Sequence, residues 1–138
     1  MAVIYEVKDV LFPKIKRRNT THWIKKVIER LNKKTGNITF IFCNDDEILR
    51  INKSYLNHDY YTDIITFDYT EEDCISGDIF ISLDTISSNA EKFGVSYEDE
   101  LHRVIIHGIL HLCGINDKTP EERQVMERHE DEALKMRK

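Results

Sequence analysis

Apolar residues recur along the chain with two spacings, every second residue in short segments and every third or fourth residue in longer ones. The first spacing is typical of strands and the second of helices. Strands are predicted at Val3–Val7, Asn37–Cys43, Ile64–Tyr69 and Asp78–Ser82, where β-branched and aromatic residues gather. A short acidic turn separates the last two, which predicts that they pair as an antiparallel hairpin.

Five helices are predicted from the longer spacing and from residues that favour helix ends. Thr20 or Thr21 is expected to cap the first helix, and Gly36 is expected to stop it. Asn44 and Glu47 resemble a capping box at the start of the second helix. The other three helices are expected at Asp84–Phe93, at Tyr97–Cys113 and from Thr119 onward.

The mixture of strands and helices indicates one domain rather than several. The chain of 138 residues has the usual length of a single domain, and neither a repeat nor a Pro/Gly-rich linker divides it. We therefore predict a single domain spanning residues 1–138, of the α/β or α+β class. Its mixed sheet of about four strands would pack with about five helices.

Composition narrows the functional classes. Hydrophobic residues make up 41% and charged residues 33% of the chain, which excludes a disordered or low-complexity protein. No apolar run is long enough to cross a membrane, and the first residues lack the pattern of a secretory signal. The 3 cysteines have no disulfide-framework spacing and are expected to be reduced. These features predict a cytoplasmic location.

Charge is distributed unevenly, although the net charge is only -5. Residues 1–53 carry 12 Lys or Arg and 6 Asp or Glu, whereas residues 54–138 carry 8 and 19. The overall acidity argues against indiscriminate nucleic-acid binding. The basic half could still present a local phosphate-attracting face, although an ordinary solvated helix surface explains the charge equally well.

The strongest chemical signal lies in the fourth predicted helix. His107 and His111 are four residues apart, so both imidazoles lie on one helix face, within reach of a single ion. A histidine pair alone is more often a satisfied core pair, but here the flanking residues are apolar, and buried imidazoles need partners. Gly114 can turn the chain back so that Asp117 reaches the same ion. Three ligands leave an open fourth position, which is typical of a catalytic zinc site and predicts a metal cleft at this helix.

Other candidate residues give weaker signals. Gly108 stands where HExxH zinc peptidases carry the Glu that serves as general base, which disfavours peptide hydrolysis. Cys113 lies on another side of the helix, and His102 is expected at the surface. Asp63 and Asp78 are considered as general bases, but neither is assigned, so the catalytic side chains stay open.

The segment His107–Gly114 resembles the HGxLHLxG signature of the YbeY family of bacterial ribosomal RNA maturation factors. Leu49–Tyr55 is similar to the family's helix ending in LNxxY, Thr62–Phe67 to its TDVLSF strand, and Gly77–Ile79 to its GDI strand. The resemblance implies a zinc-dependent, single-strand-specific endoribonuclease. It would act in 3′-end maturation of small-subunit (16S) ribosomal RNA and in ribosome quality control, with ribosomal RNA and the small subunit as partners.

Two positions depart from the family pattern. Asp117 stands where the family usually has a third histidine, and because oxygen ligands also suit manganese, Mn²⁺ is an alternative to Zn²⁺. Leu56 stands where the family commonly has an RNA-contacting arginine, so Lys16, Arg17 and Arg18 become the candidate RNA contacts. Two other functions stay open. One is another zinc hydrolase, such as a small metallopeptidase, and the other is a non-catalytic ribosome-assembly factor with a structural metal.

Overall fold

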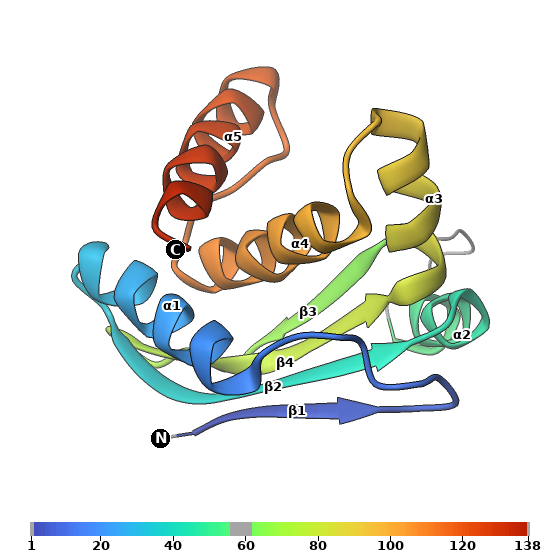
Figure 1. The fold of residues 1–138 in the computed structure, drawn as a ribbon. Coiled ribbons are helices and arrows are strands. Elements are labelled where there is room, and N and C mark those ends of the chain that lie inside the picture. The colour runs from blue at the N-terminus through green and yellow to red at the C-terminus, as the bar shows by residue number, and fades with distance from the viewer. Residues whose placement is uncertain (1, 56–61, 138) are drawn as a thin grey trace.

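The computed structural model describes residues 2–55 and 62–137 and shows an α+β fold (Figure 1). These residues form four strands and five helices, as the sequence predicted, and no helix among them is long and apolar enough to span a membrane. In chain order the elements are β1 (Val3–Val7), α1 (Arg17–Arg30), β2 (Lys34–Cys43), α2 (Asp45–Tyr55), β3 (Ile64–Asp68), β4 (Cys74–Ser82), α3 (Leu83–Phe93), α4 (Tyr97–Leu112) and α5 (Pro120–Lys135).

The strands form one mixed sheet in the order β1-β2-β4-β3. β1 pairs in parallel with β2, where Val3 lies opposite Ile38, and β2 also pairs in parallel with β4. β3 runs antiparallel to β4, with Ile64 opposite Ile81. The predicted hairpin is therefore confirmed, and β1 and β3 are the two edge strands.

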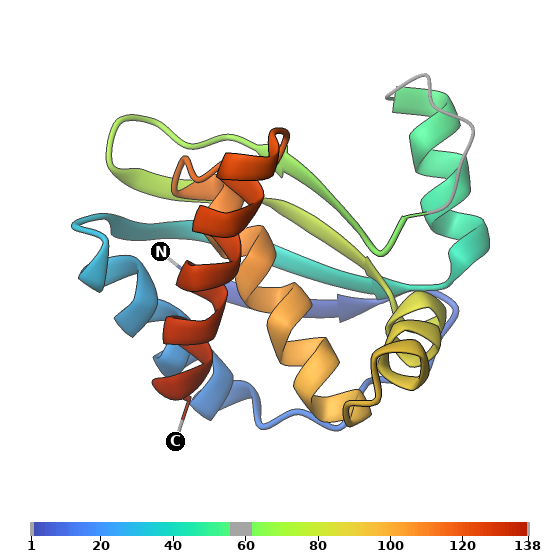
Figure 2. The same ribbon diagram turned by 90° about the horizontal axis from the view of Figure 1, so that it is seen from above.

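α1 and α4 lie against one face of the sheet, and α5 lies over α4 (Figures 1 and 2). Alternate strand residues point to this face, among them the fully buried Phe40 and Ile79. Trp23 and Ile28 of α1 and Ile105 of α4 belong to the same apolar cluster. Burial of each such side chain contributes about 1.5–3 kcal/mol to stability, so α4 is held firmly on the sheet.

α2 covers part of the opposite face. Ile48 packs there with Ile65 in a second, smaller cluster. The Oδ1 atom of Asn44 accepts a hydrogen bond from the Glu47 amide at 2.9 Å, as the predicted helix start requires. The Glu47 carboxylate pairs with Arg50 at 2.7 Å instead of completing the capping box.

Both ends of α1 differ from the prediction. The helix begins at Arg17, and its N-cap residue Lys16 makes no side-chain capping hydrogen bond. Thr20 is buried inside the helix because it faces the core, so neither threonine is the cap. After the helix, Asn32 takes a left-handed conformation with φ of 62°, and Gly36 lies inside β2.

Gly36 is needed where β2 approaches β4. A Cβ atom at this position would collide with the side chain of Ser76 and would lie 2.7 Å from the carbonyl oxygen of Ile75. β4 is correspondingly longer than predicted, because Lys34 pairs with Cys74 well before Asp78. Gly36, which was predicted to end a helix, thus allows two strands to approach closely.

Candidate metal centre

Helix α4 brings His107 and His111 side by side. The hydroxyl of Ser96 caps the helix by accepting a hydrogen bond from the Asp99 amide at 3.0 Å. Because the two histidines are one turn apart, their ring centroids lie only 4.6 Å apart. Most of the surrounding helix is buried, whereas the two imidazoles are partly exposed. Both imidazole rings therefore reach solvent from a helix that is otherwise mostly buried.

The turn after α4 returns Asp117 to these histidines. Gly114 has a φ of 94°, which favours glycine, and its amide donates to the carbonyl oxygen of His111 at 3.0 Å. The Oδ2 atom of Asp117 lies 3.3 Å from Nε2 of His107, and Oδ1 lies 3.4 Å from Nε2 of His111. The HxxxHxxxxxD spacing thus brings all three predicted side chains together.

These three side chains, which we call the donor group, could hold a metal ion. One donor atom from each lies within 4.8 Å of the other two. A tetrahedral ion with bonds of about 2.0–2.1 Å keeps its ligand atoms roughly 3.3–3.4 Å apart. Each Nε2 lies at a comparable distance, 3.3 or 3.4 Å, from a different carboxylate oxygen of Asp117. The side chains are 21% to 32% exposed, so a further coordination position can face solvent.

Glu130 of α5 orients His107, and the sequence analysis missed it. Its carboxylate accepts a hydrogen bond from Nδ1 of His107 at 2.6 Å and another from Arg103 at 2.7 Å. This bond leaves Nε2 of His107 free, and carboxylates orient metal-binding histidines in this way. The available signal was a carboxylate on the buried stripe of α5, between Met126 and Ala133, where it needs a partner.

The two histidines differ in proton affinity. Burial lowers the pKa of His107, but the hydrogen bond and charge of Glu130, with the charge of Asp117, outweigh burial and raise it overall. Burial and the charge of His107 lower the pKa of His111. The two carboxylates on either side of His107, those of Glu130 and Asp117, therefore favour a positive charge at this imidazole.

Gly108 is a packing position. A Cβ atom there would lie 2.9 Å from Cδ1 of Ile64 and 3.1 Å from Cγ2 of Ile79. A side chain at this residue would enter the contact between α4 and the sheet rather than the donor group. The missing peptidase glutamate thus has a structural reason.

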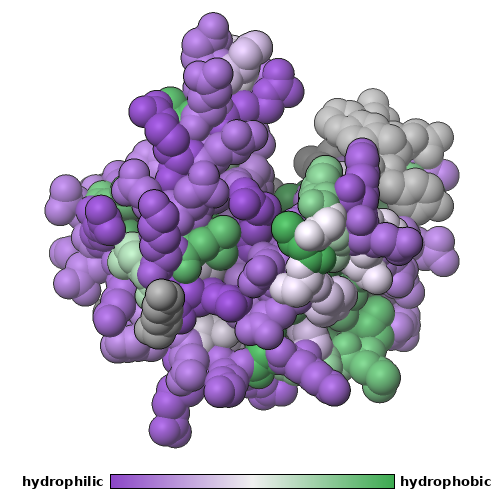
Figure 3. Space-filling view, turned by 45° about the horizontal axis from the view of Figure 1, so that its top comes forward, coloured by the Kyte–Doolittle hydropathy of each residue, from purple (hydrophilic) through white to green (hydrophobic). Residues whose placement is uncertain are grey.

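His107 and Asp117 of the donor group line a cavity of about 510 Å³ between α3, α4 and α5, which we call the acidic cleft. Hydrophilic residues dominate the face of the molecule that carries α5 (Figure 3). Arg103 and Arg123 are the arginines among the lining residues that the structure describes. Five carboxylates oppose them: Asp63, Glu100, Asp117, Glu127 and Glu130.

The remaining candidates, two carboxylates and one thiol, lie in three different places. Asp63 lines the acidic cleft, and burial raises its pKa. Asp78 lies on the other face of the sheet, because its neighbour Gly77 faces α4, and it accepts a hydrogen bond from the Tyr69 hydroxyl at 3.4 Å. Cys113 is half-buried outside the donor group, and burial raises the pKa of its thiol to about 11.

His102 is buried, so the prediction of a surface position was wrong. It is 6% exposed, its Nδ1 lies 2.7 Å from the carbonyl oxygen of Glu98, and its ring packs 5.7 Å from that of Trp23. Burial lowers its pKa. The reason is that α1 packs against this side of α4, a contact that local spacing does not contain.

The three predicted RNA contacts lie in two places. Arg17 and Arg18 line a cavity between β1 and α1, whereas Lys16 lines another beside Glu98. Leu56, where the family resemblance led us to expect an arginine, lies outside the described residues.

The fold and the donor group define a class of protein, a small α+β domain in which one buried helix and the turn after it carry three side chains that could hold a metal ion. A sequence model of the family described as Endoribonuclease YbeY matches residues 7–138, and the chain belongs to this family.

Named relatives and a solved structure agree with this assignment. The chain is 63% identical over 137 residues to Endoribonuclease YbeY of Bacteroides thetaiotaomicron, covering 99% of this chain and 100% of the relative. It is 60% identical over 134 residues to that of Parabacteroides distasonis, covering 97% and 94%. A solution structure from Thermotoga maritima, 27% identical, has a TM-score of 0.66 and covers 96% of this chain and 89% of that one.

Proposed function

We propose that the protein is a metal-dependent, single-strand-specific endoribonuclease. Its proposed role is 3′-end maturation of small-subunit (16S) ribosomal RNA and ribosome quality control, on the small subunit in the cytoplasm. The observation that carries the proposal is the convergence of His107, His111 and Asp117 beside the acidic cleft, in a chain whose named relatives are endoribonucleases.

Zinc is the proposed ion. Two imidazole nitrogens and one carboxylate form a donor set typical of catalytic zinc, and this nitrogen-rich set supports zinc over manganese, which prefers more oxygen ligands. When bound, the ion would supply Lewis acidity toward a phosphodiester oxygen and lower the pKa of a water molecule toward about 7.

The chain's own side chains would hold the ion and the RNA. Glu130 keeps the proton of His107 on Nδ1, so that Nε2 faces the donor group. Arg103 is engaged by Glu130 at 2.7 Å and by Asp131 at 3.6 Å. Arg123 lines the cleft and is exposed, so we assign it to a phosphate close to the scissile bond.

Two alternatives have weaker support. A peptidase would need a general base that Gly108 cannot supply, because that position packs on the sheet. A structural metal would favour donors closed off from solvent, whereas the donor group is partly exposed.

The test compares the wild type with a His107→Ala/His111→Ala variant and uses His129→Ala, outside the donor group, as the control. The wild type should contain stoichiometric zinc and cleave single-stranded RNA, but neither duplex RNA nor peptides. The double variant should fold, by circular dichroism, and lose both metal and cleavage, whereas the control keeps both.

Three other outcomes would contradict the proposal. Stoichiometric zinc in the folded double variant would show that the donor group is not the metal site. Peptide cleavage without RNA cleavage would identify a peptidase. Ribosome association and normal ribosomal RNA maturation in cells carrying the double variant would identify an assembly factor.

A further inference from the structure

The acidic cleft is a poor anchor for a polyanion. Five carboxylates line it against two arginines, and one divalent ion offsets only part of that negative charge. The affinity of proteins for nucleic acids depends largely on Lys and Arg contacts to phosphates. An RNA substrate therefore needs a basic surface elsewhere on the molecule.

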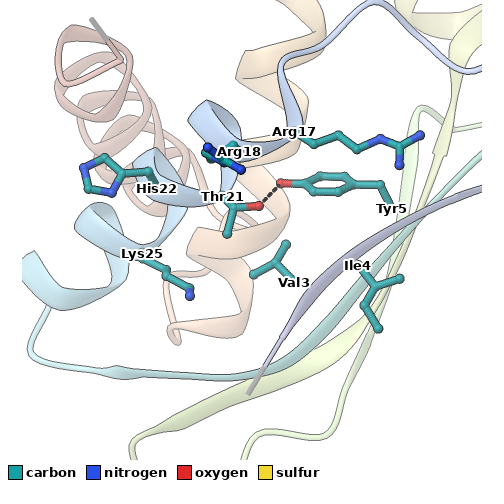
Figure 4. Close-up of a pocket in the computed structure, with 8 residues that line it drawn as sticks. All are labelled: Val3, Ile4, Tyr5, Arg17, Arg18, Thr21, His22 and Lys25. Atoms are coloured by element: carbon teal, nitrogen blue, oxygen red, sulfur yellow. Dashed lines mark hydrogen bonds between the residues drawn. The ribbon is translucent and has the colours of Figure 1, made fainter.

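Such a surface lines a cavity of about 560 Å³ between β1 and α1, which we call the β1–α1 groove (Figure 4). No carboxylate is among its lining residues in the part of the chain that the structure describes. The residues that matter here are Arg17, Arg18, His22 and Lys25 from α1, and Val3 and Tyr5 from β1.

Contacts within the protein give this groove a defined shape. The Tyr5 ring stacks on Phe40 with centroids 5.5 Å apart, and its hydroxyl shares a hydrogen bond of 2.9 Å with the hydroxyl of Thr21 (Figure 4). The guanidinium of Arg17 lies 4.0 Å from the ring centroid of Phe12. Arg17, Arg18 and Lys25 supply cations around a groove whose lining includes one half-buried aromatic ring, that of Tyr5, and such a basic groove suits the phosphates of a single-stranded nucleic acid.

The start of α1, where Arg17 and Arg18 lie, adds to this local positive charge. Its first turn carries no acidic residue, and Lys16 makes no capping hydrogen bond. Each of the other four described helices has acidic residues in its first turn. A helix N-terminus is partially positive, so Arg17 and Arg18 are repelled there, and a bound phosphate would remove that cost.

We propose that the β1–α1 groove is a second RNA-binding site, which holds phosphates of a single-stranded segment away from the bond that is cleaved. The inference rests on the proposed endoribonuclease function. The groove lies at edge strand β1, whereas Asp63 of the acidic cleft directly precedes the other edge strand, β3. Three strand spacings of about 4.8 Å separate these edges by at least roughly 14 Å, and Asp63 lies beyond the end of β1 that is remote from Val3. A long oligonucleotide is therefore needed to reach both sites, and a dinucleotide is too short.

The experiment uses the zinc-loaded protein and an Arg17→Gln/Arg18→Gln/Lys25→Gln variant. On a single-stranded RNA of about 30 nucleotides, the variant should lose about tenfold in kcat/KM through KM, with kcat unchanged. Three lost phosphate contacts should also reduce the slope of log affinity against log salt by about 2. Cleavage of a dinucleotide should stay at the wild-type rate.

A Lys34→Gln/Lys92→Gln/Lys135→Gln variant is the matched control, since it removes the same charge at exposed positions outside the groove. It should stay within about twofold of the wild type on the long RNA, because diffuse charge is a small term beside direct phosphate contacts. Equal losses in both variants, or an unchanged salt slope in the groove variant, would overturn the inference.

A binding measurement separates this inference from the proposed function. If the wild type cleaves neither RNA, the proposed function fails, and fluorescence anisotropy with the same long RNA then tests the groove alone. Weaker binding by the groove variant than by the control variant supports the second site, and equal binding by the two rejects it.

Discussion

The acidic cleft and the β1–α1 groove arrange charge in opposite ways. In the cleft, Glu130 and Asp117 flank an imidazole, so negative charge is concentrated where a cation is to be held. In the groove, Arg17 and Arg18 stand at the positive end of α1 with no acidic residue in the first turn, so positive charge is concentrated where an anion fits. The comparison assigns the cleavage chemistry to the acidic cleft and most of the affinity for RNA to the β1–α1 groove.

The two regions also differ in rigidity. Glu130 is 5% exposed and is fixed by hydrogen bonds of 2.6 and 2.7 Å, whereas Arg17 and Arg18 are exposed. A metal centre tolerates errors of only a few tenths of an ångström, whereas phosphate contacts tolerate mobile side chains. Substitutions in the cleft should therefore have larger effects than those in the groove.

The largest effect is expected from Asp117→Ala, which removes one of three donors. The ion should be held more weakly, and RNA cleavage should fall by more than about 100-fold, because even a residue that only supports a ligand is worth 10–100-fold. Binding of a long RNA should persist because the groove is untouched. Zinc titration, cleavage rates and anisotropy measure the three quantities.

Asp117→His provides the informative partner variant. It replaces a carboxylate by a neutral imidazole, and it should keep the metal, favour zinc more strongly over manganese and leave activity of the same order. If Asp117→Ala binds zinc as tightly and cleaves as fast as the wild type, Asp117 is only a polar turn residue.

A smaller effect is expected from Glu130→Gln, which keeps the shape of the side chain but removes the charge beside His107. Metal affinity should fall about 10–100-fold, as is usual when the carboxylate that orients a metal-binding histidine is lost. Glu127→Gln is the control, because Glu127 lines the same cleft, whereas the carboxylate bonded to Nδ1 of His107 is that of Glu130. Equal zinc affinity in the Glu130 variant and the wild type would rule out the orienting role.

Arg123→Gln tests whether the arginine in the acidic cleft and the cations of the β1–α1 groove contact different parts of the RNA. Loss of a charged phosphate contact in the cleft should raise KM by about tenfold. Because this contact is close to the scissile bond, a dinucleotide and a long RNA should be affected equally, unlike in the groove variant. Arg128→Gln, on α5 outside the lining of the cleft, should have no effect. A loss confined to the long RNA would remove Arg123 from the cleavage site.

The smallest effect concerns His102, on the side of α4 that faces α1. Burial lowers its pKa in the folded protein, so the unfolded chain takes up the proton first as the pH falls. Its stabilising contribution is therefore complete above about pH 6.5, the pKa in the unfolded chain, and is lost as the pH falls toward the folded value. Urea unfolding between about pH 7.5 and 5 should show the wild type losing more of its free energy of unfolding than His102→Gln. Parallel curves would contradict this prediction.

The sequence predicted what depends on short chain separations and missed what depends on packing. His107, His111 and Asp117 converge because a helical turn and a glycine turn are local, and their spacing is visible in the residues. Glu130 comes from a different helix, so only its place on a buried stripe pointed to a partner. His102 was misplaced because α1, far away in the chain, covers it.

The same limit explains the errors in the fold. Thr20 was predicted to cap α1, but it lies on the core-facing side of the helix, which begins three residues earlier at Arg17. Gly36 looked like a helix stop, but it allows β2 to approach β4. The hairpin of β3 and β4, joined by a short turn, was predictable because its pairing is local.

The single tryptophan of the chain gives this molecule an optical reporter. The indole of Trp23 is 3% exposed, and its N–H donates to the carbonyl oxygen of Ala133 on α5 at 2.7 Å. α5 also carries Glu130, so the helix that supports the donor group is the one that shields the fluorophore. Emission should therefore shift to longer wavelength whenever α5 leaves its place, and an unlabelled sample will show in real time whether zinc removal loosens that helix.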